Sequence, residues 1–232
     1  EEFWTKANLR KIMNQSFIDK TSILQTRPKY SNVGKKEILS RFFADKEIGT
    51  ALKPVIVTAY DLEKRQPVLI SSYKDPKVSV VEAANASSAA PIYFPTAGMN
   101  DGRWLIDGGI ATNNPSLLGY VEAKKLFGTN NIKILGIGAG LNKRKINGRR
   151  SKNWGALGWL RHDILGIMLE SSLQNEILKD LVGDNYLRVN SSIQKVNRRM
   201  DDISDRNLIR IKDLSDEWWS KFGKKAINFL NS

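Results

Sequence analysis

The sequence has no cysteine and only one histidine, His162. Disulfide bonds and thiolate metal sites are therefore excluded, and so is any metal site that needs two histidines. Apolar runs long enough to cross a membrane, about 18 residues, are also missing. Residues 1–6 lack the order of a secretory signal. The sequence thus predicts a cytoplasmic or peripheral membrane protein, and it leaves secretion open because residues that once preceded Glu1 could have been removed.

Acidic residues are few relative to basic ones, with 24 Asp and Glu against 37 Lys and Arg and a net charge of +13. Such a surplus attracts phosphate-bearing surfaces of any kind. The densest basic stretch has no acid and contains Lys143, Arg144, Lys145, Arg149 and Arg150. Its asparagines and glycine predict a flexible loop, either simply solvated or in contact with an anionic membrane surface. Nucleic acid is not an expected partner, because no recognised binding module accompanies the run.

The chain alternates between strand and helix patterns. Runs rich in β-branched residues predict strands at 54–60, 68–72, 103–106, 132–137 and 186–189. The first two are close enough to form a hairpin or neighbouring strands. Helical patterns cover 80–90, 115–127, 164–182 and 215–230. This order predicts an α/β fold with a mainly parallel sheet covered by helices, in a single domain over residues 1–232.

The most chemically suggestive segment begins at Ile106 and continues with Asp107, Gly108 and Gly109. An acid at the end of a strand, followed by two residues without side chains, places a carboxylate at the sheet edge where α/β proteins bind ligands. Asn114 and Pro115 then have the pattern of a helix start. The alternative is an ordinary tight turn with a surface aspartate.

The neighbouring residues carry a resemblance to a known family. Residues 83–95 read AANASSAAPIYFP, and they are followed by LIDGG at 105–109 and NNP at 113–115. In order and spacing these blocks resemble the central signature of patatin-like phospholipases. Similar matches at 54–62, 134–140, 154–160 and 185–190 extend the resemblance over nearly the whole chain.

The resemblance implies a three-layer α/β/α fold and a lipid acyl hydrolase of the phospholipase A or lysophospholipase type. In that family a serine in a Gly-x-Ser-x-Gly turn attacks the ester, and the aspartate of the Asp-Gly-Gly motif, here Asp107, is its base partner. Gly108 and Gly109 would shape the active-site turn. No metal or organic cofactor is expected, and the implied partner is a phospholipid or another acyl lipid.

The chain departs from the family pattern because neither a Gly-x-Ser-x-Gly motif nor a glycine-rich oxyanion loop occurs between Glu1 and Ser232. We therefore expect the serine to be on an N-terminal fragment of the same protein, and this chain alone to be inactive. Exposed strand edges should make it associate with that fragment or aggregate. The alternatives are an inactive lipid- or protein-binding member and a basic module that binds phosphate or nucleic acid.

Several other features carry weaker functional interpretations. His162 could complete a triad, but a surface histidine is the expected role. Ser87 and Ser88 lack the flanking glycines of a nucleophile turn and are expected to pack. Two apolar stripes, one over 154–169 and one over 219–230, have the pattern of interfacial helices, although core packing explains such stripes equally.

Overall fold

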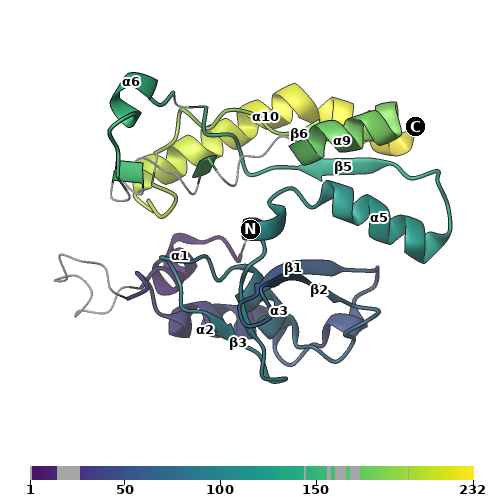
Figure 1. Ribbon diagram of the computed structural model, residues 1–232, viewed down its shortest axis with the longest axis horizontal. Helices are drawn as coiled ribbons and strands as arrows, with labels where there is room; N and C mark the ends of the chain where they lie inside the picture. The colour runs from purple at the N-terminus through teal and green to yellow at the C-terminus, as the bar shows by residue number, and fades with distance from the viewer. Residues whose placement is uncertain are drawn as a thin grey trace. The chain divides into compact units, whose positions relative to one another are not determined.

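The structure is a computed structural model that describes residues 2–14, 27–143, 145–155, 158–159, 166–167, 173–197 and 199–232. The chain divides into two compact units, Glu1–Thr112 and Asn113–Ser232. Each unit has its own strands and helices, most of which are labelled in Figure 1.

The first unit contains a four-stranded sheet in the order β2-β1-β4-β3. Its strands are β1 (Ile56–Asp61), β2 (Gln66–Ser71), β3 (Ala97–Gly98) and β4 (Trp104–Asp107). All three strand pairs are antiparallel. The predicted hairpin is confirmed by the pairing of β1 with β2. Asp61 closes its turn by accepting hydrogen bonds from the backbone N of Glu63 and Lys64, each at 3.0 Å.

Five helical segments accompany this sheet. They are α1 (Lys6–Ile12), α2 (Asn32–Phe43), η1 (Ile48–Thr50), α3 (Val80–Ser87) and α4 (Gly109–Thr112). The predicted start of α3 is confirmed, because the Ser79 side chain accepts a hydrogen bond from Val81 N at 3.2 Å. Glu82 has the spacing of a capping box with Ser79, but its side chain accepts a hydrogen bond from Asn100 N at 2.7 Å. The helix also ends at Ser87, before the predicted end at residue 90.

Small side chains allow α3 to pack closely on the sheet. Ala83, Ala86 and Ala89 are almost completely buried and share one core cluster with Ile70 of β2 and Leu105 of β4. A helix surface made of alanines lets the backbone approach the strands, because no bulky side chain intervenes. This close packing fixes the end of α3 relative to β4, and Asp107 is the last residue of that strand.

The second unit contains two parallel strands, β5 (Ile134–Ile137) and β6 (Tyr186–Val189). Its helical segments are α5 (Ser116–Phe127), α6 (Gly148–Ser151), α9 (Leu173–Val182), η2 (Gly183–Asn185) and α10 (Asp205–Asn231). Helix α5 packs against β5, whereas α9 and α10 pack against β6. The strand pair is therefore accompanied by helices, as expected for parallel strands.

The α/β class predicted from the sequence is confirmed, but strand direction differs from the prediction of a mainly parallel sheet. Parallel pairing occurs between β5 and β6, whereas the first unit's pairs are antiparallel. The connections explain the difference. Residues 62–65 join β1 to β2, and residues 99–103 join β3 to β4. Parallel pairing requires a crossover of about a dozen residues or more, so these short connections can only produce antiparallel pairs.

The terminal helix begins at Asp205 rather than at the predicted Ser215. Ser204 is its N-cap, and its side chain accepts a hydrogen bond from Asn207 N at 3.4 Å. An acid in the first turn, Asp205, also favours this start. No helix in the described part of the chain is both long enough and apolar enough to cross a membrane.

Candidate functional site

The sheet of the first unit holds the backbone of Asp107 from two sides. Asp107 ends β4 and pairs with Ala59 of β1. Its backbone N donates a hydrogen bond to Ala89 O at 3.2 Å, just beyond the end of α3. The predicted position of this acid, at the end of a strand, is confirmed. Its backbone cannot move without disturbing either the strand pair or the segment after α3.

The two carboxylate oxygens of Asp107 differ in their surroundings. Oδ1 accepts a hydrogen bond from Gly109 N at 2.7 Å, which fixes the side chain over the turn. No hydrogen bond to Oδ2 is found among the residues that the structure describes. One oxygen is therefore anchored, and the other is available to accept a proton from an incoming group.

Burial raises the pKa of Asp107 above its ordinary value. The hydrogen bond from Gly109 and the positive charge of Lys35 oppose this rise. Half-burial penalises the charged form, so the carboxylate gains basicity. A carboxylate whose pKa is raised in this way is a better proton acceptor than one on the surface.

Gly108 allows β1 to lie directly against the turn that follows Asp107. A Cβ at this position would stand 2.5 Å from Thr58 Oγ1, and it would also overlap the backbone carbonyl of Thr58. No other residue type fits without moving the strand. Gly108 is thus required by close approach of the backbone, and α4 begins immediately after it at Gly109.

Lys35 is a charged residue of this region that the sequence motifs do not single out. It lies in the first turn of α2 and is only 4% exposed. Burial lowers the pKa of Lys35 to about 8, and the charge of Asp107 opposes that change. The spacing in the sequence indicates that Lys35 faces the core, because Ile38 and Leu39 follow it by three and four residues on the same helix face. Both are buried in the structure.

The serines near this site do not form a nucleophile turn. Ser87 ends α3, and Ser88 is its C-cap. The Ser88 hydroxyl donates a hydrogen bond to Ala84 O at 2.6 Å, within the same helix. A nucleophile turn needs a serine between a strand and a helix start. These two serines occupy a helix end instead.

A comparison with family models decides the relationship. The model described as patatin-like phospholipase matches residues 1–118, which is just over half of the chain and includes Asp107 with both of its glycines. The chain belongs to the patatin-like phospholipase family.

Individual relatives of this patatin-like chain come from plants and bacteria. Patatin-like protein 1 of Arabidopsis thaliana is 30% identical over 213 residues, 75% of this chain and 51% of the relative. A cGAMP-activated phospholipase of Pseudomonas aeruginosa (strain BWHPSA011 / Pa011) is 28% identical over 172 residues, 69% of this chain and 51% of the relative. Patatin-11 of Solanum tuberosum is 25% identical over 221 residues, which cover 78% of this chain and 56% of the relative. The chain thus spans about half the length of the curated relatives it matches.

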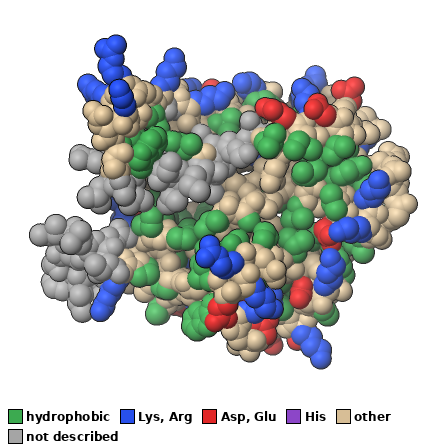
Figure 2. Space-filling view, viewed as in Figure 1, with side chains coloured by type: hydrophobic (Ala, Val, Ile, Leu, Met, Phe, Trp, Pro, Cys, Tyr) green, Lys and Arg blue, Asp and Glu red, His purple; other side chains and the backbone are tan. Residues whose placement is uncertain are grey.

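The basic loop of this patatin-like chain lies in the second unit. Lys143, Lys145, Arg149 and Arg150 are all exposed, whereas Arg144 lies outside the described residues. Part of the loop is helical, because Asn147 accepts a hydrogen bond from Arg150 N at 3.0 Å and caps α6. Figure 2 shows Lys and Arg side chains gathered over the region of α6. Arg149 and Arg150 are thus presented to solvent from a short capped helix, whereas Lys143 and Lys145 precede it.

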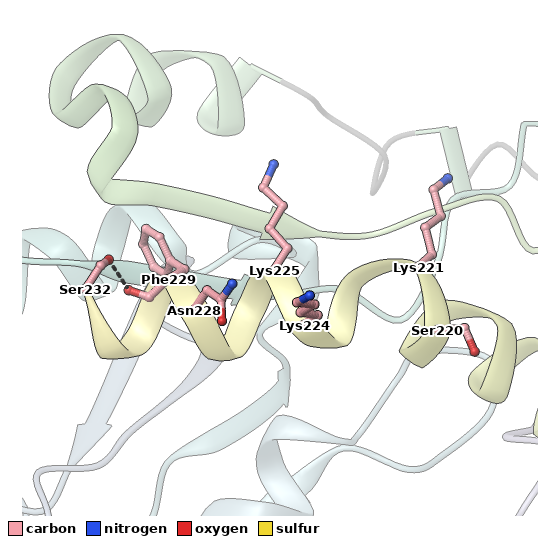
Figure 3. A pocket seen from close by; sticks show the side chains of 7 residues that line it. All are labelled: Ser220, Lys221, Lys224, Lys225, Asn228, Phe229 and Ser232. Carbon is pink, nitrogen blue, oxygen red and sulfur yellow. Dashed lines mark hydrogen bonds between the residues drawn. The ribbon is translucent and has the colours of Figure 1, made fainter.

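A second basic surface lies on the last turns of α10. A shallow hollow there is lined by Ser220, Lys221, Lys224, Lys225, Asn228, Phe229 and Ser232. In Figure 3, Lys221 and Lys225 extend in the same direction from the helix, on the side where Phe229 also lies. The predicted apolar stripe is only partly buried, since Trp219 is 66% exposed and Leu230 is 60% exposed.

The far end of the motif, at Asn114 and Pro115, belongs to the second unit. Pro115 rather than Asn114 is the N-cap of α5. Asn114 nevertheless holds the helix start, because its Oδ1 accepts hydrogen bonds from Ser116 N at 3.3 Å and Ser116 Oγ at 2.7 Å. Arg188 of β6 donates to the same oxygen at 3.2 Å.

The sequence also contains a possible third member of a catalytic triad, His162. His162 lies outside the described residues. No group of three or more His, Asp and Glu side chains suited to a metal ion occurs in the described ranges. Asp107 and its turn therefore form the candidate site.

Proposed function

We propose that this chain supplies the aspartate of a lipid acyl hydrolase that works with a serine and an aspartate, of the phospholipase A or lysophospholipase type. The observation that carries the proposal is the geometry of Asp107. One of its carboxylate oxygens is anchored by Gly109 N at 2.7 Å, and the carboxylate is partly buried with a raised pKa. Membership of the patatin-like phospholipase family supports the same conclusion.

In the proposed reaction Asp107 acts as a general base. A serine hydroxyl placed about 2.6–3.2 Å from Asp107 Oδ2 transfers its proton to that oxygen as it attacks the ester carbonyl. Asp107 returns this proton to the departing alcohol, and the acyl group stays on the serine. Water then attacks the acyl enzyme as Asp107 accepts its proton, and Asp107 passes this proton to the serine oxygen as the fatty acid leaves. The reaction requires no histidine.

The proposal places the serine outside residues 1–232, because these residues contain no Gly-x-Ser-x-Gly motif. The second unit supports this part of the proposal. Its sheet has only two described strands, and Ile137 on β5 is 72% exposed. Parallel strands are ordinarily buried on both faces, and two strands alone are marginally stable. An additional strand from outside residues 1–232 would pair with this sheet.

An anionic membrane surface is the proposed setting of the reaction. Lys143, Lys145, Arg149 and Arg150 are exposed, and Lys221 and Lys225 add a second group of positive charges on α10. Each basic group near lipid headgroups contributes about 1 kcal/mol to binding. The net charge of +13 adds a long-range attraction to the same surface. These charges would retain the protein where its substrate is concentrated.

Serine labelling tests the proposal directly. The whole protein is treated with a fluorophosphonate probe, and the labelled peptide is identified by mass spectrometry. We expect the label on a serine in a Gly-x-Ser-x-Gly sequence outside these 232 residues, and much less label in the Asp107→Asn variant. The matched control is Asp101→Asn, which removes an exposed acid paired with Arg103. Label on Ser87 or Ser88, or undiminished label in Asp107→Asn, would contradict the proposal.

A further inference from the structure

Lys35 is unusual because a lysine ammonium group is rarely buried without an anionic partner in direct contact. Its Nζ donates a hydrogen bond to Ser88 O at 3.1 Å and a longer one to Asn85 O at 3.4 Å. It also lies over the ring of Phe94, 4.1 Å from the ring centroid. The ammonium group is thus held by two carbonyls and one aromatic face.

The two carbonyls that Lys35 contacts belong to the C-terminal end of α3. A helix C-terminus carries a negative partial charge and leaves its last carbonyls without helical partners, so a cation is favoured there. Lys35 therefore joins α2 to the end of α3. In this position its charge is partly compensated by the helix rather than by solvent.

The segment that Lys35 holds is also the segment that holds Asp107. Ser88 O accepts from Lys35 Nζ, and the carbonyl of the next residue, Ala89, accepts a hydrogen bond from Asp107 N at 3.2 Å. Lys35 and the backbone of Asp107 therefore contact adjacent carbonyls. A displacement of Lys35 would release the end of α3, and this release would loosen the turn that carries Asp107.

The charges of Lys35 and Asp107 also act on each other. The positive charge of Lys35 lowers the pKa of Asp107 and opposes the effect of burial. In return, Asp107 raises the pKa of Lys35, while burial and the neighbouring Lys36 lower it to about 8. Such coupling is reciprocal, because each charge stabilises the charged form of the other by the same free energy.

From these contacts we propose that Lys35 is a positioning residue for Asp107: it fixes the end of α3 behind the carboxylate and favours the charged form of that carboxylate. Its catalytic consequence rests on the proposed hydrolase function. Lys35 itself touches no reacting atom. At low pH, protonation of Asp107 itself ends its action as a base. At high pH, Lys35 loses its positive charge as the pH rises above its pKa of about 8, and its support for the charged carboxylate is lost.

The first test measures the coupling without any enzyme activity. The Asp107 carboxyl group is titrated by carbon NMR in the wild-type protein and in Lys35→Met, a variant of similar length without charge. We expect a higher pKa of Asp107 in Lys35→Met. The control is Lys36→Met, which removes an exposed lysine from the same helical turn and should leave the pKa of Asp107 unchanged. An unchanged pKa in Lys35→Met overturns the proposal.

A reciprocal measurement covers the case in which Lys35→Met does not fold. The Lys35 side chain is titrated by NMR in the wild-type protein and in Asp107→Asn. Removal of the carboxylate charge should lower the pKa of Lys35 below its wild-type value of about 8. If the pKa of Lys35 is the same in both proteins, the two groups are not coupled and the proposal fails.

Activity of the whole protein then separates this inference from the proposed function. In Lys35→Met the acid limb of the pH profile of kcat/KM should move to higher pH, and Lys35→Arg should restore it. A role in folding alone would lower activity equally at every pH, and this result would contradict the proposal. If the NMR coupling is present but no form of the whole protein hydrolyses lipid esters, Lys35 keeps its role toward Asp107 and the hydrolase proposal is wrong.

Discussion

At the scale of single residues, the candidate site depends on Asp107, whose carboxylate is held in a partly buried position where the loss of solvent disfavours its negative charge. The Asp107 backbone donates to Ala89 O, and its Oδ1 accepts from Gly109 N. Burial raises the pKa of Asp107. Proteins keep such unfavourable groups at functional sites, where stability is exchanged for reactivity. The buried Lys35 behind it belongs to the same local arrangement.

Replacement of Gly108 by alanine should destabilise the first unit. The new Cβ would overlap the Thr58 carbonyl and stand 2.5 Å from Thr58 Oγ1, so strand β1 would have to move. Overpacking of this kind lowers the free energy of unfolding by about 1–3 kcal/mol. We expect Gly108→Ala to lie at the upper end of this range, because the backbone of Thr58 cannot rotate away as a side chain can. Urea denaturation measures the change.

The control for this substitution is Gly119→Ala in α5, where the added Cβ would meet nothing within 4 Å. Alanine in a helix interior is favoured over glycine by about 1 kcal/mol. We therefore expect Gly119→Ala to stabilise the protein slightly. Equal effects of the two substitutions would show that the contact with Thr58 does not constrain Gly108.

Lys35 should make stability depend on pH in the alkaline range. Its pKa is about 8 in the folded protein, against an ordinary value of 10.5, so the unfolded chain binds more protons between these limits. The free energy of unfolding therefore rises with pH across this window. Relative to Lys35→Met, the wild-type protein should gain up to about 3 kcal/mol.

Urea denaturation followed by circular dichroism at a series of pH values measures this gain. Lys53→Met serves as the control, because this lysine is exposed and does not act on the pKa of Lys35, so the variant should follow the wild-type curve. A difference between wild type and Lys35→Met that stays constant from pH 8 to 10.5 would show that Lys35 titrates normally.

At the scale of elements, local patterns identify much of the site. Spacing and residue type predict three of its features: the hairpin of β1 and β2, the Ser79 cap of α3, and the position of Asp107 at the end of β4. The role of Lys35 cannot be predicted from local patterns, because its burial depends on the packing of α2 against α3. These two helices are distant in the sequence. Glu82 has the spacing of a local capping box, yet it bonds to Asn100 N.

Strand direction is less predictable than strand position. The order of strands and helices indicates parallel pairing, and β5 with β6 follows that rule. In the first unit, short connections override it and produce antiparallel pairs. The start of α10 at Asp205 is marked in the sequence, because Ser204 is a preferred N-cap residue and Leu208, Ile211 and Leu214 follow it at helical spacing.

The basic loop provides a prediction at the same scale. Substitution of Lys143, Arg144, Lys145, Arg149 and Arg150 by glutamine should weaken binding to vesicles that contain phosphatidylserine. At about 1 kcal/mol for each group near the headgroups, the loss should exceed roughly a hundredfold. Vesicle co-sedimentation measures it, and phosphatidylcholine vesicles should show little change.

A matched variant distinguishes the loop from total charge. Substitution of five lysines elsewhere, Lys6, Lys53, Lys64, Lys77 and Lys179, by glutamine removes the same charge without changing the loop. If this variant loses as much binding to phosphatidylserine vesicles as the loop variant, net charge rather than the loop directs the protein to the surface.

At the scale of the whole molecule, the chain carries the proposed base, Asp107, and exposed basic residues, but its sequence has no Gly-x-Ser-x-Gly motif. The family model matches residues 1–118, and the chain spans about half the length of the relatives it matches. The two described strands of the second unit's sheet leave edges at which a further strand could pair. We therefore expect activity only when a serine turn is present beside Asp107.

The most direct test is hydrolysis of a phospholipid and a lysophospholipid by the whole protein with Asp107→Asn. Asparagine keeps the size of the side chain and cannot accept the serine proton, so kcat/KM should fall by about 10²–10⁴-fold. Asp101→Asn should retain wild-type activity. Hydrolysis by Asp107→Asn at the wild-type rate would show that Asp107 is not the base and would contradict the proposed function.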